Sequence, residues 1–280
     1  MTIGQRNNQS GVPVYDSVRR GQAAWEELLE VWHYRDLVYQ LARRDIVARY
    51  KRSVLGVAWT MLNPLGMMIV LTIVFSQVFR AVEGYPAYVL SGLIAWLFFA
   101  QTTSAIIHSL VWGGEFFRRI YVPRSAFAIS AIGTGLVNIC LSLVPLIGVM
   151  LVIGVPIRAT LLLIPLPIVI LAFFALGFGL LIASIAIYFP DVVEMYNVIL
   201  MAWMYFTPIL YPLEILPDRV QVLMRFNPMF SIIRLFRLPI YEGKIPTFVE
   251  ILPALSFTLV AFILGWWIFT KKSDDFAYRT

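Results

Sequence analysis

The sequence predicts an all-α integral membrane protein with six transmembrane helices, an N-terminal amphipathic interface helix, and short external helices between the fifth and sixth spans. Hydrophobic residues make up 60% of the 280 residues and charged residues only 14%, which leaves too few polar side chains to cover a soluble globule. Six stretches of at least 19 residues contain no charged side chain. An α-helix needs about 20 apolar residues to cross a hydrocarbon core of about 30 Å, so each stretch can form one span.

Charged residues set the limits of the predicted spans, because a charge in hydrocarbon costs about 2.5 to 3.5 kcal/mol on insertion scales. We divide the chain into a cytoplasmic N-terminal segment, 1–52, and a transmembrane domain, 53–280. The spans are predicted over residues 54–79, 87–111, 127–154, 161–188, 193–212 and 250–270. In the fourth span, the small residues Ala175, Gly179 and Ala183 recur at every fourth position, which predicts close helix packing.

The distribution of Lys and Arg predicts the orientation. The first fifty residues lack the short apolar core of a cleavable signal peptide, so we expect the N-terminus to stay in the cytoplasm. Fifteen Lys and Arg residues then fall on cytoplasmic segments and seven on outer segments, in the sense of the positive-inside rule. Both termini are expected in the cytoplasm. A nucleic-acid partner is not expected despite the net charge of +6, because the basic residues are spread along hydrophobic segments.

The residues before the first span predict an amphipathic helix that lies along the membrane. Trp25, Leu28, Leu29 and Trp32 recur at the spacing of one helical face. The basic residues that follow are Arg43, Arg44, Arg49, Lys51 and Arg52. Each attracts anionic lipid by about 1 kcal/mol. They indicate either an anchoring helix that only sets topology, or a site for a phosphorylated lipid head such as a pyrophosphate, which needs several donors at once.

The segment between the fifth and sixth spans predicts two short helices at the outer surface. Pro217 and Pro228 occupy the positions of first-turn prolines, and Asn227 precedes the second as a capping residue. Apolar residues follow each proline at three- and four-residue spacing. We therefore expect amphipathic helices that lie on the outer surface or re-enter it.

Aromatic and hydroxyl side chains share one face of the fifth predicted span. This face contains Tyr196, Leu200, Trp203, Thr207 and Tyr211. It indicates either a channel lining past which sugars can slide, or an interfacial aromatic belt with Trp203 packed between helices. Trp59, Phe75 and Phe79 on the first span are open to the same two interpretations. We take Tyr196, Trp203, Thr207, Tyr211 and the three aromatic residues of the first span as candidate channel-lining residues.

No energy source for transport is visible in the sequence. The only Gly-Lys pair, Gly243-Lys244, is followed by Ile245, so the chain has no P-loop for nucleotide phosphates. The two histidines, His33 and His108, have no ligand-forming partner at suitable spacing, so no metal site is expected. The charge-free spans lack the ionisable residue that an ion-coupled carrier usually needs. Energy must come from another subunit, or the protein is a passive pore or scaffold; no cofactor and no catalytic residue are expected in this chain.

The cytoplasmic loop between the second and third spans predicts a docking element. Glu115 near its start and Arg118 and Arg119 near its end suit the dipole of a brief helix, which Pro123 ends. Its aromatic residues would lie in the membrane interface or enter a partner's groove. The candidate coupling residues are Glu115, Phe116, Phe117, Arg118, Arg119, Tyr121, Pro123 and Arg124.

Several motifs resemble the ABC-2 family of permeases that export lipid-linked polysaccharide. The run from Leu41 to Trp59, followed by Asn63-Pro64, resembles the opening of these permeases, and the loop from Phe117 to Arg124 resembles their coupling helix. Further similar motifs are Ile187 to Asp191, Tyr205 to Tyr211 and Asn227-Pro228. The resemblance extends from about Leu37 to Lys272, in order and with six spans.

The resemblance implies a homodimer in a bacterial inner membrane, with two copies of a separate subunit that binds ATP and magnesium. It also implies a channel between the two permeases, near the interface helix and the first and fifth spans. The implied cargo is a polysaccharide on undecaprenyl diphosphate, as for O-antigen; the alternatives are capsular polysaccharide, teichoic acid, or a small lipid or drug. A membrane-embedded lipid or glycosyl transferase would need catalytic acids or bases near the headgroups, and the charge-free spans argue against it.

Overall fold

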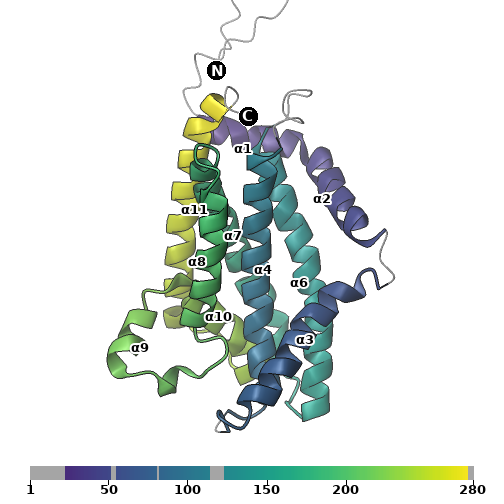
Figure 1. Cartoon of the computed structure of the whole chain (residues 1–280), viewed down its shortest axis with the longest axis vertical. Helices are drawn as coiled ribbons and strands as arrows, with labels where there is room; N and C mark the ends of the chain where they lie inside the picture. The colour runs from purple at the N-terminus through teal and green to yellow at the C-terminus, as the bar shows by residue number, and fades with distance from the viewer. Residues whose placement is uncertain (1–22, 52–54, 81, 114–122, 277–280) are drawn as a thin grey trace, which may run out of the picture.

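Five long helices form an up-and-down bundle in the computed structural model, which describes residues 23–51, 55–80, 82–113 and 123–276 (Figure 1). The long helices are α3 (Ala58–Phe75), α4 (Tyr85–Val111), α6 (Ser125–Ile153), α7 (Pro165–Ala186) and α11 (Phe248–Phe276). All five are long and apolar enough to cross a membrane. Every regular element in the described ranges is helical. The chain is therefore an all-α, multi-pass membrane protein.

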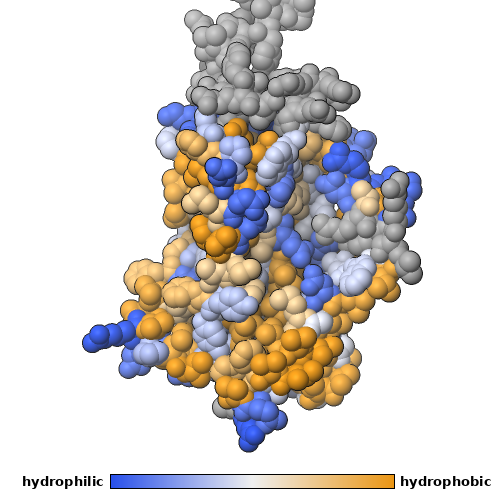
Figure 2. Space-filling model, viewed as in Figure 1, coloured by the Kyte–Doolittle hydropathy of each residue, from blue (hydrophilic) through white to orange (hydrophobic). Residues whose placement is uncertain are grey.

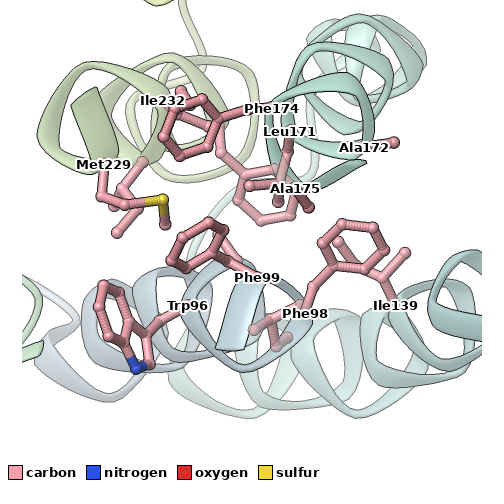
Figure 3. Packing of buried hydrophobic residues seen from close by; sticks show 14 of the residues in the cluster. Trp96, Phe98, Phe99, Ile139, Leu171, Ala172, Phe174, Ala175, Met229 and Ile232 are labelled. Carbon is pink, nitrogen blue, oxygen red and sulfur yellow. The ribbon is translucent and has the colours of Figure 1, made fainter. Parts of the chain in front are cut away.

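The core of the bundle lies around α4 and α7. Buried residues make up 72% of the most apolar window of α4 and 67% of the corresponding window that includes α7, but only 11% to 22% for α3, α6 and α11. Figure 3 shows Phe98 and Phe99 of α4 facing Leu171 and Phe174 of α7, with Ile139 of α6 beside them. The peripheral helices expose apolar faces, so hydrophobic colour dominates the lower part of the surface in Figure 2. Such faces suit contact with lipid or with another subunit.

Two glycines bring α7 and α11 into backbone contact. A Cβ atom at Gly265 would collide with the carbonyl oxygen of Gly177, and one at Gly177 would collide with the backbone of Phe262. The predicted small residues of this helix face elsewhere: Gly179 leaves room for Ile106 of α4, and close packing there is confirmed. The crossing of α7 and α11 thus depends on a second small-residue pair that the spacing argument missed.

The fifth predicted span is shorter than expected. It is represented by α8 (Val192–Phe206), whose 15 residues cover about 22 Å, rather than by residues 193–212. The helix ends because Pro208 disfavours a helical conformation at Thr207, whose backbone is extended at φ −83°, ψ 135°. The prediction that this helix reaches residue 212 is therefore wrong, and spanning length is confirmed for five of the six predicted helices.

The other spans differ from their predicted limits mainly at their ends. The first begins four residues late, at Ala58, and the second two residues early, at Tyr85, after Gly84 in a left-handed conformation. The fourth begins with the 3-10 turn η2 (Ala159–Leu163) before α7. The last continues to Phe276, beyond the predicted end at residue 270.

Two helices precede the bundle, where the sequence predicts an amphipathic interface helix. Helix α1 (Ala23–His33) lies across the end of the bundle at which α11 ends, and contacts α6 and α11 (Figure 1). Helix α2 (Arg35–Tyr50) packs along α6. The position of α1 across the helix ends is the one expected of an interface helix; its placement in a membrane interface stays a prediction.

The segment after α8 contains two short helices, as predicted, and their placement at an outer membrane surface stays a prediction. Helix α9 (Asp218–Met224), preceded by the 3-10 turn η3 (Leu213–Ile215), protrudes at the side of the bundle (Figure 1). Helix α10 (Pro228–Arg237) is inserted among α4, α7 and α11 and continues as the short π-helix η4 (Leu238–Glu242). The predicted cap of α10 is confirmed, because the Asn227 side chain accepts a hydrogen bond from the amide of Met229 at 3.1 Å.

We predict that Gly265→Ala destabilises the protein, because a methyl group at this position meets backbone that cannot move aside. Overpacking of this kind costs about 1 to 3 kcal/mol. Gly148→Ala is the matched control, since a Cβ atom at Gly148 meets nothing within 4 Å. Thermal unfolding of the purified chain in detergent should show a lower midpoint for Gly265→Ala only. Equal midpoints for the two variants would contradict the close α7–α11 crossing.

Candidate functional site

A break in the helical backbone after α8 is held by side chains from other helices. Four consecutive carbonyl oxygens, those of residues 208–211, each accept a side-chain hydrogen bond. The Arg237 guanidinium donates to Pro208 at 2.8 Å and to Ile209 at 2.7 Å. The hydroxyl of Tyr85 donates to Leu210 at 2.8 Å, and that of Tyr88 to Tyr211 at 3.0 Å. We call residues 207–211 the broken segment. Its irregular backbone is tolerated inside a membrane protein because its carbonyls are satisfied.

Arg237 is the central donor of this arrangement. Its side chain is buried, and it also donates to the carbonyl of Tyr88 at 3.2 Å and lies over the Tyr88 ring, 3.7 Å from the centroid. Gly92 on α4 leaves the space that the guanidinium occupies. Because carbonyl oxygens and an aromatic face carry partial negative charge, they offset part of the cost of burying the cation. The guanidinium therefore holds α4, α10 and the broken segment together.

A second polar contact connects α8 with α10. The indole nitrogen of Trp203 donates to the side-chain oxygen of Asn227 at 2.9 Å, and the Asn227 amide donates to the hydroxyl of Thr207 at 3.0 Å. Asn227 thus caps α10 and fixes the end of α8 with one side chain.

The predicted face of the fifth span points into the helix bundle. Tyr196 is 3% exposed and donates to the Thr103 hydroxyl at 2.6 Å, and Thr207 is 1% exposed. Trp203 packs edge-on against Trp96 and Phe99 of α4. Tyr211 lies half-buried and donates to the carbonyls of Tyr205 and Phe206. These contacts favour helix packing in this conformation, and the channel-lining role of the four residues stays a prediction.

The three aromatic residues of the first span lie in two places. Phe75 and Phe79, at the end of α3 and just beyond it, stack on each other, and Phe79 contacts the Tyr85 ring. Trp59, in the first turn of α3, is 57% exposed. The structure therefore separates Trp59 from the other two, and any channel-lining role of the three residues stays a prediction.

An open cavity of 290 Å³ with both polar and apolar walls lies beside Trp59, between α3, α4 and α6. Its lining includes the carboxamides of Asn63, Gln101 and Asn138. Hydroxyl groups of Thr60, Thr102 and Ser142 accompany them, and the described part of the chain contributes no charged residue to the lining. Sequence analysis missed this group because its members come from three helices, one or two polar residues at a time, in otherwise apolar stretches.

The start of α6 connects the predicted coupling loop to α1. The Ser125 hydroxyl donates to the buried Glu27 carboxylate at 2.8 Å. Burial lowers the pKa of Arg124, and the nearby Glu27 carboxylate acts in the opposite direction. Pro123 is buried at the same place. The remaining candidate coupling residues, Glu115, Phe116, Phe117, Arg118, Arg119 and Tyr121, lie outside the described residues, so their role stays a prediction.

The basic residues of the interface segment are partly described. Arg43 is exposed on α2, and Arg44 forms an exposed ion pair with Asp45 at 3.0 Å. Lys51 is exposed at the end of α2. Arg52 and the side chain of Arg49 lie outside the described part of the chain. An exposed basic face suits both the anchoring and the lipid-head interpretation, and the choice between them stays open.

The fold and these sites define a class of protein: a multi-span membrane protein whose polar groups serve to hold helices and line a cavity. In the described ranges, no group of three or more His, Cys, Asp or Glu side chains is placed to hold a metal ion. The polar contacts at the broken segment are structural hydrogen bonds to backbone. The arrangement suits a transport subunit.

The chain belongs to the ABC-2 type transporter family, which matches residues 36–241. It is similar to the O-antigen export system permease protein RfbA of Myxococcus xanthus, with 29% identity over 89% of this chain and 96% of that protein. It is also 28% identical to an RfbA of Klebsiella pneumoniae over 86% of this chain and 94% of the relative. The polysialic acid transport protein KpsM of Escherichia coli is 22% identical over 85% and 93% of the two chains.

We predict that Arg237→Met destabilises the protein, because it leaves the carbonyls of Pro208 and Ile209 without their side-chain donor. Each unpaired buried carbonyl costs about 1 to 3 kcal/mol. Arg234→Met is the matched control on α10, since the Arg234 side chain is exposed and its nearest carboxylate oxygen, on Glu250, is 3.9 Å away. A lower unfolding midpoint in detergent is expected for Arg237→Met alone. If both variants melt like the parent, the guanidinium does not hold the broken segment.

Proposed function

We propose that the chain is the transmembrane subunit of an ATP-driven transporter that exports a lipid-linked polysaccharide across a bacterial inner membrane. The observation that carries this proposal is similarity to O-antigen export permeases over 86% to 89% of the chain and at least 94% of theirs. The relation to a polysialic acid transport protein supports polysaccharide as the cargo class. The cargo we propose is O-antigen-like and attached to undecaprenyl diphosphate.

The energy comes from a separate subunit in this proposal. The sequence contains no P-loop, and its charge-free windows hold no residue for ion coupling. Two copies of an ATPase subunit, each binding ATP and magnesium, would act on two copies of this chain. The apolar faces of α3 and α8, which expose Ile73, Val198 and Met201, supply surface for the second copy.

Helix α8 and the broken segment make the sixth crossing in this proposal. A 15-residue helix is about 8 Å too short for a core of about 30 Å, and the buried backbone after it completes the path. In Figure 1, α8 starts at the end of the bundle where α1 lies and runs toward the opposite end. Six crossings place α1 and the end of α11 on one side, which the excess of Lys and Arg assigns to the cytoplasm.

Removal of the chain from its native cells tests the proposed function. We expect completed lipid-linked polysaccharide to accumulate in the inner membrane and to disappear from the cell surface. Mass spectrometry of the trapped lipid identifies the carrier and separates this cargo from the alternatives, capsular polysaccharide, teichoic acid and a small lipid or drug. Re-expression of the parent chain is the control. Unchanged surface polysaccharide in cells without the chain would refute the proposal.

We predict that replacing Arg118 and Arg119 together with Glu uncouples ATP hydrolysis from export. In the proposed transporter, these residues contact an acidic surface of the ATPase subunit, and reversing their charge replaces attraction with repulsion. The complex should assemble less well, or hydrolyse ATP without response to cargo. Copurification of the ATPase subunit and cargo-stimulated ATP hydrolysis are the two readouts. Parental values for both would overturn this coupling assignment.

We predict that Arg43→Gln with Arg44→Gln lowers export more than membrane insertion if α2 binds a phosphorylated lipid head. Arg35→Gln is the control, because Arg35 is exposed on the same helix outside the basic group and lies near the Trp32 ring. Insertion is measured by the amount of chain in washed membranes, and export by surface polysaccharide. If the double variant exports as much polysaccharide as the parent, the lipid-head interpretation is rejected and α2 serves only as an anchoring helix.

A further inference from the structure

The cavity between α3, α4 and α6 holds polar groups far from the ends of the spanning helices. Gln101 is ten residues from the nearer end of α4 and Asn138 is thirteen from the nearer end of α6. At 1.5 Å per residue, both lie at least about 15 Å inside their helices. The cavity therefore lies near the middle of the bundle. In Figure 2, hydrophilic colour appears at mid-height between α4 and the start of α3.

Three of the cavity's polar side chains lack a hydrogen-bond partner in the described part of the chain. They are the carboxamides of Asn63 and Gln101 and the hydroxyl of Thr102. Others are engaged; the Ser142 hydroxyl, for example, donates to the carbonyl of Asn138 at 2.9 Å. Each carboxamide offers two donors and an acceptor. Asn63 and Gln101 are exposed in the single chain, whereas Thr102 is buried. Hydrocarbon offers these groups no hydrogen bond, so an occupant that donates to and accepts from them is favoured.

The chemistry of the lining identifies the occupant. A pyrophosphate would require cationic donors, and none of the described residues that line the cavity is charged. An acyl chain would leave both carboxamides unpaired. Sugar hydroxyls both donate and accept, so they match carboxamides, and the exposed ring of Trp59 at the rim offers a flat face for the C–H side of a sugar ring. The volume of 290 Å³ is at the small end for ligand sites, which suits one sugar residue rather than a polymer segment.

We propose that this cavity is a binding site for one uncharged sugar residue of the exported glycan, held by Asn63, Gln101 and Thr102 beside the Trp59 ring. The proposal rests on the proposed function, because the glycan reaches the cavity as cargo. Gly135 preserves the site: a Cβ atom there would collide with the Thr102 hydroxyl and approach Phe98. The cavity lies beside Trp59 and apart from Tyr196 and Thr207, so it is distinct from the predicted channel face of the fifth span.

Photo-cross-linking in native cells tests the site. The chain, expressed with its ATPase subunit, carries p-benzoylphenylalanine in place of Trp59, and the adduct formed under ultraviolet light is stained for carbohydrate after periodate oxidation. We expect a carbohydrate-positive adduct, with a yield about tenfold lower when Asn63→Leu and Gln101→Leu are added, because each removes hydrogen bonds of about 1 kcal/mol or more. Gln40→Leu, which removes an exposed carboxamide from α2, should leave the yield unchanged.

The outcomes separate this inference from the proposed function. Assembly with the ATPase subunit and basal ATP hydrolysis are measured for every variant, because both are lost when a variant fails to fold. If the Asn63→Leu and Gln101→Leu variant fails to fold, Thr102→Val takes its place in the cross-linking experiment. Two results overturn the cavity site even if export proceeds. One is a cross-link only to a second copy of the chain, and the other is a carbohydrate adduct whose yield is unchanged by Asn63→Leu and Gln101→Leu. If cells without the chain display normal surface polysaccharide, the proposed function itself fails, and the sugar site fails with it.

Discussion

The pairing of backbone carbonyls in the broken segment is the constraint on which the rest of the structure depends. A chain that leaves its helix inside a membrane protein must satisfy its backbone within the protein, since hydrocarbon offers no partners. Here Arg237, Tyr85 and Tyr88 supply the donors. The donors come from α4 and from the end of α10, so α10 must be inserted in the bundle for the break to exist. The short α8, the inserted α10 and the glycine at position 92 are consequences of one requirement.

The same requirement distinguishes the two polar regions of the bundle. Around the broken segment, each carbonyl of residues 208–211 has a side-chain donor, and only the Nε atom of Arg237 is left without a partner among the described residues. The indole of Trp203, the Asn227 amide and the Thr207 hydroxyl are joined by hydrogen bonds. In the cavity beside Trp59, the Asn63 and Gln101 carboxamides have no partner among the described residues. A satisfied polar network rigidifies a structure, whereas an unsatisfied one invites a ligand. The first region is therefore assigned to architecture and the second to binding.

Sequence reasoning predicted the features that depend on local pattern. Charge-free windows located the spans, and the Asn227-Pro228 pair located the start of α10, because caps and spans are set by neighbours in the chain. It placed the end of α8 six residues too late, although Pro208 is a local signal for that end. The hydrogen bonds by which Arg237 and Tyr85 satisfy the carbonyls after the break come from distant parts of the chain and could not be predicted. The contact of Gly177 with Gly265 and the convergence of Asn63, Gln101 and Asn138 also depend on helices far apart in sequence, and no single-helix spacing contains that information.

The central claim is that this bundle moves a glycolipid only when a separate ATPase drives it. The most direct measurement places the purified chain in liposomes with lipid-linked polysaccharide labelled on one leaflet, alone or together with its ATPase subunit and magnesium. The account predicts that the label reaches the other leaflet only with the ATPase subunit and hydrolysable ATP. Vectorial movement of the glycolipid by the chain alone, or its absence in the complete and ATP-hydrolysing complex, would contradict the account.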